Sequence, residues 1–333
     1  MQPSATETPV LFIIFNRPDT TQKVFQTITK ARPSRLYIAA DAPRPEVKGE
    51  AEKCQAAREI TQQIDWDCEI HTLLHNSNQG CKAAICHAIT WFFDHEELGI
   101  ILEDDCLPAP SFFGFCSELL ERYRYDDRIM MISGTNLMIE TPEITSSYYF
   151  SRLPHIWGWA GWRRAWDVHD PEMKSFPEFF SNNRHHELFL DNNVAYYWLR
   201  LWLITYLDKI DTWDYAWVYS CFVNNGLAIT PKKNLISNIG FGEHSTHTKN
   251  SHSKYSNMPS YEIDRIEHPA FVYCNEKADT EEYRKLRVYP RIAKPTIKYR
   301  IKRRRRLSKY KRKIREQIKE HPIDHEKTPI HRT

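Results

Sequence analysis

The first 133 residues alternate short apolar runs with stretches of helical length, and this alternation limits the fold more than any other feature. The runs that we interpret as strands are residues 10–15, 36–40, 68–74, 99–102 and 129–133. Between them we expect helices at residues 19–31 and 47–64, after Asn78-Gln79-Gly80, and at residues 111–123, with Asp19 and Ser111 as caps. This order predicts an α/β fold, Rossmann-like, with a mostly parallel sheet and helices on both faces.

The composition changes at about residue 148. Eight of the ten Trp lie beyond that point, together with many Tyr and His, and strand–helix alternation is less clear there. From about Tyr289 the chain is polar and strongly basic. We therefore expect three parts: residues 1–147, an aromatic-rich part at residues 148–288 that belongs to the same domain, and a basic C-terminal tail at residues 289–333.

Charge and cysteine usage indicate the compartment. Twelve of the 46 Lys and Arg lie between Lys298 and Arg315 without an acid among them, so the rest of the chain holds 34 basic residues against 43 acidic ones. An anionic membrane surface would attract such a tail by about 1 kcal/mol per cation, and nucleic acid is the less favoured partner. The eight Cys form no CxxC pair, and the N-terminus has no signal-peptide pattern. We expect a cytoplasmic protein. Two interpretations of the tail compete: it holds the protein on the inner face of the membrane, or it is a solvated or partly helical tail.

Three adjacent acids, Glu103, Asp104 and Asp105, directly follow the fourth apolar run. Adjacent carboxylates repel one another unless a divalent cation and ligand hydroxyls share the charge. An isolated acidic triplet is more often a solvated turn, but the position at the end of a central strand favours a Mg²⁺ or Mn²⁺ site. Such a cation takes one or two carboxylates and completes its shell with phosphate oxygens and water.

The other strand ends are polar as well. Asn16 and Arg17 follow the first run, Asp41 follows the second, and Gly80 and Lys82 follow the third. Ligands of parallel sheets bind beyond the carboxyl ends of the strands, where these groups would meet. Arg and Lys suit phosphate, and a carboxylate accepts hydrogen bonds from a base or a ribose.

In these residues the chain resembles glycosyltransferases of the GT-A fold, in particular bacterial relatives of the Golgi N-acetylglucosaminyltransferase family that use nucleotide-diphospho-sugars. The similarity covers about residues 9–248. The segments that carry it are residues 9–17, 40–41, 101–113, 155–162 and 212–217.

The resemblance implies a metal-dependent transfer of a hexosyl or N-acetylhexosaminyl group from a nucleoside diphosphate, UDP by preference, to a glycan or lipid-linked acceptor in bacterial polysaccharide synthesis. Residues 1–147 would bind the donor, and residues 148–288 the acceptor. The donor would be held by Asn16, Arg17, Asp41, Gly80, Lys82, Glu103 and Asp104. Asp105 would bind the metal. Asp214 would be the general base of an inverting displacement, although the relatives have two acids where this chain has Asp214 and Tyr215.

Two further segments are candidates for the site. Trp157, Gly158 and Trp159 offer flat apolar faces and a close backbone approach to a sugar, with core packing as the competing interpretation. The segment at residues 240–248 has two Gly as hinges for closure over a nucleotide, and His247 is a candidate metal ligand.

Two alternatives stay open. A sugar nucleotidyltransferase would share the parallel sheet and the metal carboxylates, but usually has a Gly-rich phosphate loop, and residues 12–21 contain no Gly. A noncatalytic carbohydrate- or nucleic-acid-binding protein would use the aromatic part or the basic tail. That interpretation leaves four polar strand ends unexplained.

Overall fold

The computed structural model describes residues 6–141, 143–242, 253–286 and 288, with six single positions between 301 and 316. His247 lies outside the described residues, and so does most of the basic segment between Lys298 and Arg315.

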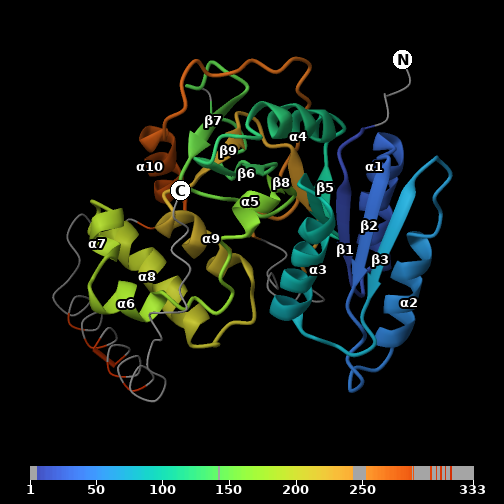
Figure 1. Ribbon diagram of the computed structural model, residues 1–333, viewed down its shortest axis with the longest axis horizontal. Coiled ribbons are helices and arrows are strands. Elements are labelled where there is room, and N and C mark those ends of the chain that lie inside the picture. Colours follow the sequence, from blue (N-terminus) through green and yellow to red (C-terminus); the bar gives the residue numbers. More distant parts are fainter. Residues whose placement is uncertain are drawn as a thin grey trace. The chain divides into compact units, whose positions relative to one another are not determined.

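An eight-stranded sheet forms the centre of the fold, in the order β3-β2-β1-β4-β8-β6-β9-β7 (Figure 1). Six strands run in one direction, whereas β8 and β7 run the opposite way. The bounds are β1 Val10–Ile14, β2 Arg35–Ala40, β3 Glu69–Leu74, β4 Leu98–Glu103, β6 Ile129–Ser133, β7 Tyr148–Ser151, β8 Trp159–Trp162 and β9 Leu227–Pro231. Strands β5 (Cys106–Pro108) and β10 (Ile236–Asn238) form a separate antiparallel pair. The predicted α/β fold with a mostly parallel sheet is confirmed.

Both faces of the sheet are buried, as the continuous apolar runs predicted. Along β1, Phe12 belongs to a core that includes α1, α2 and α4, whereas Leu11 belongs to a second core that includes α3, α5 and α9. The period of two along a strand divides neighbouring residues between the two cores in this way. These helices are α1 Pro18–Ala31, α2 Glu50–Ile60, α3 Cys81–His95, α4 Ser111–Arg122, α5 Arg163–Trp166 and α9 Asp214–Val223.

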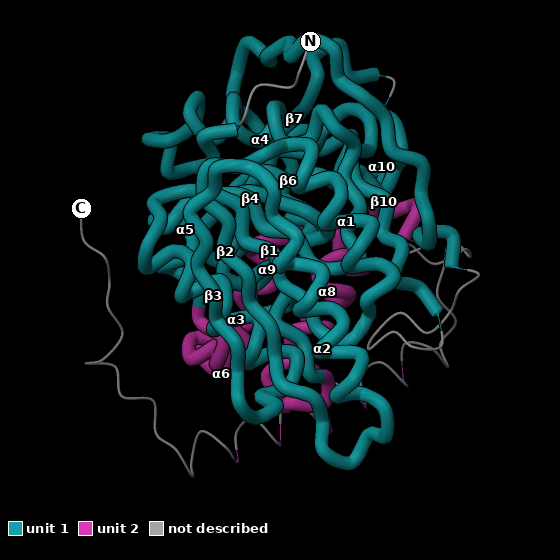
Figure 2. Tube along the Cα trace, turned by 90° about the vertical axis from the view of Figure 1, so that its right-hand side faces the viewer, with its two compact units in different colours: residues 1–169, 211–282 teal, residues 170–210, 283–333 magenta. Residues whose placement is uncertain are grey.

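The chain divides into two compact units (Figure 2). The first comprises residues 1–169 and 211–282 and holds every strand of the described residues; the second comprises residues 170–210 and 283–333. The second contains α6 (Phe176–Ser181), α7 (His185–Leu188) and α8 (Asn192–Tyr206), and α10 (Glu276–Lys285) begins in the first and ends in the second. Strands β7, β8 and β9 join the same sheet as the earlier strands, as expected if residues 1–147 and 148–288 belong to one domain. The expected boundaries at residues 147/148 and 288/289 stay predictions.

Two helix starts differ from the sequence prediction. Helix α1 begins at Pro18, and Asp19 lies within its first turn without capping it. Ser111 is the first residue of α4, and its hydroxyl accepts a hydrogen bond from the N–H of Ile263 at 3.0 Å. Pro at the first helical position already favours a helix start, because its missing N–H is one that the helix cannot use.

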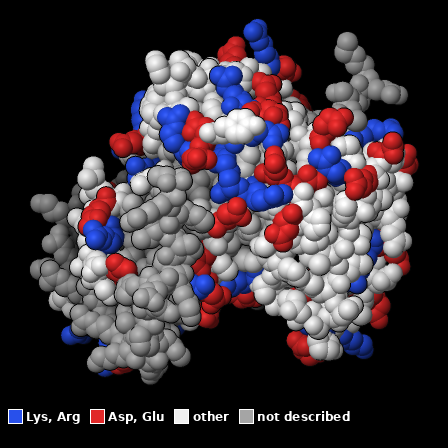
Figure 3. Space-filling view, in the orientation of Figure 1, with Lys and Arg blue, Asp and Glu red and all other residues white. Residues whose placement is uncertain are grey.

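The described surface carries charge of both signs. Acidic and basic side chains lie interspersed over the upper part of the face drawn in Figure 3. Within the described residues, no helix is both long enough and apolar enough to cross a bilayer.

Candidate active site

The three acids at the end of β4, which we call the acidic cluster (Glu103, Asp104 and Asp105), meet Arg17 at the end of β1. Strands β1 and β4 are parallel neighbours, so their carboxyl ends lie at the same edge of the sheet. Arg17 donates from Nη2 to Asp104 Oδ1 at 2.5 Å and from Nη1 to Asp105 Oδ2 at 2.8 Å. The N–H of Phe15 donates to Asp104 Oδ2 at 3.1 Å. The predicted convergence of these two strand ends is therefore present.

The guanidinium of Arg17 faces the acidic cluster, and burial shifts the pKa values of Glu103, Asp104 and Arg17. Burial, followed by the charges of Asp105 and Asp104, raises the pKa of Glu103 to about 8. Burial also raises the pKa of Asp104 to about 6, against the opposing effect of Arg17. Burial lowers the pKa of Arg17, but Asp104 and Asp105 outweigh it, and the net pKa is raised. Burial and the neighbouring acids therefore outweigh the effect of Arg17 on the pKa values of Glu103 and Asp104.

The donor set of the acidic cluster suits one kind of metal site. Glu103 Oε1 is buried and has no hydrogen-bond partner among the described residues. No group of three His, Cys, Asp or Glu side chains in the described part of the chain is arranged to hold a metal ion. These oxygens therefore do not fit an all-protein cage. They fit a hard cation that takes one or two carboxylates and completes its shell with phosphate oxygens and water.

Asn16 has a structural partner that the sequence did not indicate. Its Nδ2 donates to Oε1 of Glu50 at 2.7 Å, and Glu50 is itself only 2% exposed. Arg44 binds the same carboxylate through its backbone N–H at 2.7 Å and through Nη2 at 2.5 Å. Hydrogen bonds from Arg44 lower the pKa of Glu50 to about 2. Asn16 thus ties the end of β1 to the start of α2.

We expect Glu50→Gln to destabilise the protein by roughly 1–2 kcal/mol at pH 7. The folded-state pKa of Glu50 lies below its ordinary value of 4.5, so its stabilising effect is complete above pH 4.5 and is lost as pH falls toward 2. Urea unfolding at pH 7 and pH 3 measures this difference, which should be smaller at pH 3. Glu59→Gln on the same helix is the control, because Glu59 is exposed and bonds to Gln55. Equal losses at both pH values would contradict the prediction.

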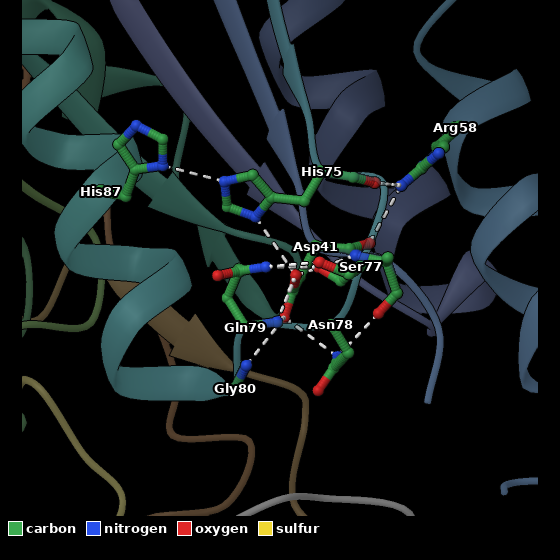
Figure 4. A network of polar contacts seen from close by, with 9 residues as sticks. Asp41, Arg58, His75, Ser77, Asn78, Gln79, Gly80 and His87 are labelled. Atoms are coloured by element: carbon green, nitrogen blue, oxygen red, sulfur yellow. Dashed lines mark hydrogen bonds and ion pairs between the residues drawn. The ribbon is translucent and has the colours of Figure 1, made fainter. Parts of the chain in front are cut away.

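Asp41 orders the loop after β3 (Figure 4). It is 9% exposed, and its oxygens accept hydrogen bonds from the N–H groups of Ala42, Gln79 and Gly80 and from Asn78 Nδ2, at 2.9–3.1 Å. Its Oδ1 also lies 3.2 Å from Nδ1 of His75, whose Nε2 lies 2.9 Å from His87 Nδ1. The prediction that Asp41 contacts the nucleotide is therefore not supported by its hydrogen bonding, since protein donors already occupy both oxygens.

Gly80 and Lys82 lie where α3 begins. Gly80 adopts a φ of +83°, a left-handed conformation that favours glycine. The backbone N–H of Lys82 donates to Asp211 Oδ1 at 3.1 Å. Burial, and then the positive charge of Lys82, lower the pKa of His169 to about 3. Lys82 thus acts electrostatically on His169, a neighbour that the sequence analysis did not link to it.

Asp214 is the first residue of α9 and lies partly buried. The hydroxyl of Thr212 donates to its Oδ1. Asp214 is also among the negative charges that raise the pKa of Glu103, after burial and the acids beside it, and that of Cys81, after burial, Glu103 and Asp211. These effects associate Asp214 with the acidic cluster, although 109 residues separate it from Asp105 in the chain.

The aromatic segment belongs mainly to the core, which corrects part of the prediction. Trp159 is 1% exposed and stacks with Trp213 and Trp217 at centroid distances of 6.1 Å, so its ring offers no face to a sugar. A Cβ on Gly158 would lie 2.5 Å from Ile236, so this glycine permits close internal packing rather than ligand approach. Trp157 is only partly buried, and it meets Phe241 edge to face at 5.6 Å.

Gly240 lies directly against the acidic cluster. A Cβ at this position would come within 2.1 Å of Asp105 Oδ2 and 2.5 Å of Arg17 Nη1. The N–H of Ile239 donates to the backbone oxygen of Asp105 at 2.9 Å. The described start of the segment at residues 240–248 is therefore part of the site's wall, and the hinge role expected of its two Gly stays a prediction.

No family model and no curated protein matches the sequence. Several solved structures, among them the three that follow, are similar to parts of the fold. HddC from Yersinia pseudotuberculosis is 7% identical over 47% of this chain and 77% of its own, with a TM-score of 0.30. UDP-glucose pyrophosphorylase complexed with UDP-glucose is 11% identical over 49% and 79%, with a TM-score of 0.30. The inositol-1-phosphate CTP transferase from T. maritima is 11% identical over 48% and 73%, with a TM-score of 0.27. A likeness this distant carries no argument about activity.

Proposed function

We propose that this protein is an enzyme that uses a nucleoside-diphosphate sugar and transfers the sugar to an acceptor hydroxyl. The observation that carries the proposal is the acidic cluster at the end of β4. Three consecutive acids are enclosed at the carboxyl edge of a mostly parallel sheet, and Arg17 contacts two of them. This edge is where such sheets bind ligands. Glu103 Oε1 has no hydrogen-bond partner among the described residues, which supports a bound cation or a ligand hydroxyl as its partner.

In this proposal Asp105 would hold a divalent cation, Mn²⁺ or Mg²⁺, beside the diphosphate. When bound, the cation offsets the charge that develops on the departing diphosphate. Arg17 orients Asp104 and Asp105 and adds positive charge beside the diphosphate. Glu103 and Asp104 accept hydrogen bonds from ribose or sugar hydroxyls. Lys82 and Gly80 belong to the loop that borders the donor.

Asp214 would take the proton of the acceptor hydroxyl, and Trp157 would border the acceptor. A single base opposite the leaving group inverts the anomeric centre. The resemblance in sequence motifs favours UDP as the nucleotide. It also favours a glycan or a lipid-linked molecule as the acceptor. The tail between Lys298 and Arg315 would bring a membrane-bound acceptor close by its attraction to anionic lipid.

The test is calorimetric titration of UDP into the whole protein, first with Mn²⁺ and then with a chelator. We expect binding that depends on Mn²⁺ and that Asp105→Ala weakens by at least tenfold. Asp126→Ala is the control, because this acid pairs with Arg128 away from the acidic cluster. Absence of binding to UDP and to every other nucleoside diphosphate would favour the noncatalytic binding protein instead.

A second candidate, a sugar nucleotidyltransferase, shares the same edge and metal chemistry. The names of two neighbours, UDP-glucose pyrophosphorylase and CTP transferase, belong to that class, although their TM-scores are near 0.3. The two reactions release different products. Sugar transfer releases UDP from a UDP-sugar. Nucleotidyl transfer joins the nucleotidyl group of a nucleoside triphosphate to a sugar phosphate and releases pyrophosphate. Assays of both products with the same preparation distinguish the candidates.

A further inference from the structure

Helix α3 begins without a capping side chain of its own. Its N-cap residue is Gly80, which has no side chain to accept the free N–H groups of the first turn. Asp211, about 130 residues later, accepts them instead. Its Oδ2 receives the N–H of Cys81 at 3.2 Å, and its Oδ1 receives the N–H of Lys82 at 3.1 Å. The sequence analysis did not identify Asp211, because a cap from a distant residue has no local signature.

Two carboxylates share this loop. Asp41 accepts the N–H groups of Gln79 and Gly80, and Asp211 accepts the next two, those of Cys81 and Lys82. Four consecutive backbone donors are therefore held by acids from two separate places in the chain. Gly80 also allows the close approach, because a Cβ there would lie 3.3 Å from Asp211 Oδ2.

The other end of this connection is Asp214. Thr212 and Trp213 are 7% and 3% exposed, so the segment that follows Asp211 is packed into the first unit. Trp213 stacks on Trp159, and the Thr212 hydroxyl donates to Asp214. A displacement of Asp211 would therefore be passed to Asp214 through two buried residues.

We propose that Asp211 is a positioning residue that holds the donor loop at residues 79–82 and the general base Asp214 in a fixed relation. This inference rests on the proposed function, because it assigns Asp214 as the base. Asp211 contacts backbone N–H groups and no reacting atom. Its effect on the reaction is exerted through the position of Asp214 relative to the start of α3.

Asp211→Asn tests the inference, because the amide has one acceptor oxygen and no charge. We expect kcat/KM for release of UDP from a UDP-sugar to fall by about tenfold or more. Asp191→Asn is the matched control: Asp191 caps α8 in the second unit by accepting the N–H groups of Asn193 and Val194. Both variants lose a charged helix cap and should lose similar amounts of thermal stability. Only Asp211→Asn should lower turnover per folded molecule, and equal turnover in both would overturn the inference.

A double variant separates positioning from general weakening. If Asp211 acts through Asp214, Asp211→Asn should slow the Asp214→Asn protein by less than twofold, because the effects of residues that act as a unit are not additive. A full tenfold loss on top of Asp214→Asn would contradict the proposal.

Amide hydrogen exchange keeps this inference separate from the proposed function. In Asp211→Asn we expect faster exchange both at residues 79–82 and at residues 212–214, whatever the enzyme's substrate. Faster exchange at the start of α3 alone would overturn the coupling. If the wild-type protein released UDP from none of the UDP-sugars while both segments loosened together, the proposed function would fail and the structural link would stand.

Discussion

Replacement of Asp214 by Asn should lower the turnover number by a factor of about 10²–10⁴, the usual contribution of a general base. The amide cannot take the proton of an acceptor hydroxyl, yet it keeps the size of the side chain and can still accept the hydrogen bond from Thr212. Binding of UDP in the presence of Mn²⁺ should change by less than threefold, because Asp214 faces the acceptor in this proposal. Steady-state kinetics with a UDP-sugar, combined with calorimetry, measures both quantities.

Tyr215 supplies the control for this assignment, since it directly follows Asp214 in α9. Tyr215→Phe should keep turnover within about threefold of the wild-type value, because the phenol is not the base in this proposal. A large loss in Tyr215→Phe together with a small loss in Asp214→Asn would show that the base is assigned wrongly. A large rise in the Kd for UDP in Asp214→Asn would instead indicate a donor-side role.

The parallel part of the sheet could be predicted because its strands are buried on both faces. The run at residues 10–15 is continuously apolar, and β1 indeed lies between two cores. Strand β8 could not be predicted in the same way. It consists of Trp159, Ala160, Gly161 and Trp162, and it pairs antiparallel with both β4 and β6. Its place in the sheet depends on partners 26 to 64 residues earlier, which no local pattern shows.

The acidic cluster and Arg17 could be predicted from topology alone, because parallel neighbours bring their carboxyl ends together. The partners of the other candidate residues could not. Asp41 is satisfied by a loop whose conformation depends on Gly80, and Asn16 is satisfied by Glu50, a residue that reads as an ordinary helical acid. Trp159 matched a sugar-binding pattern, but a Trp beside glycines serves equally well where strands and indoles pack closely. Residue type identifies which groups are able to bind a ligand, whereas the hydrogen bonds decide which of them remain available.

Arg17→Met should destabilise the ligand-free protein by about 3 kcal/mol at pH 8, because it removes the cation that pairs with two enclosed carboxylates. The loss should shrink as pH is lowered toward 4. The pKa of Asp104 is already raised to about 6 by burial, and without Arg17 it rises further. The native state then binds more protons than the unfolded chain between about pH 4 and pH 8, so stability falls as pH rises through this window. Urea unfolding at pH 5 and pH 8 measures the difference.

The stabilising effect of a divalent cation distinguishes a metal-binding site from an acidic cluster that has only a structural role. A cation that binds only the native state stabilises it by RT ln(1 + c/Kd), where c is the free cation concentration, so tighter binding gives a larger stabilisation. Removal of Arg17 leaves the oxygens of Asp104 and Asp105 without their strongest partner, so Mn²⁺ should raise the melting temperature of Arg17→Met more than that of the wild type. Arg44→Met is the control: it breaks a similar pair with Glu50, a carboxylate that is not part of the acidic cluster. If Mn²⁺ stabilised the two variants equally, the acidic cluster would have no special affinity for the ion. The metal role of Asp105 would then have to be abandoned, because Asp105 is the carboxylate proposed to bind the cation and Arg17→Met leaves it without its guanidinium partner.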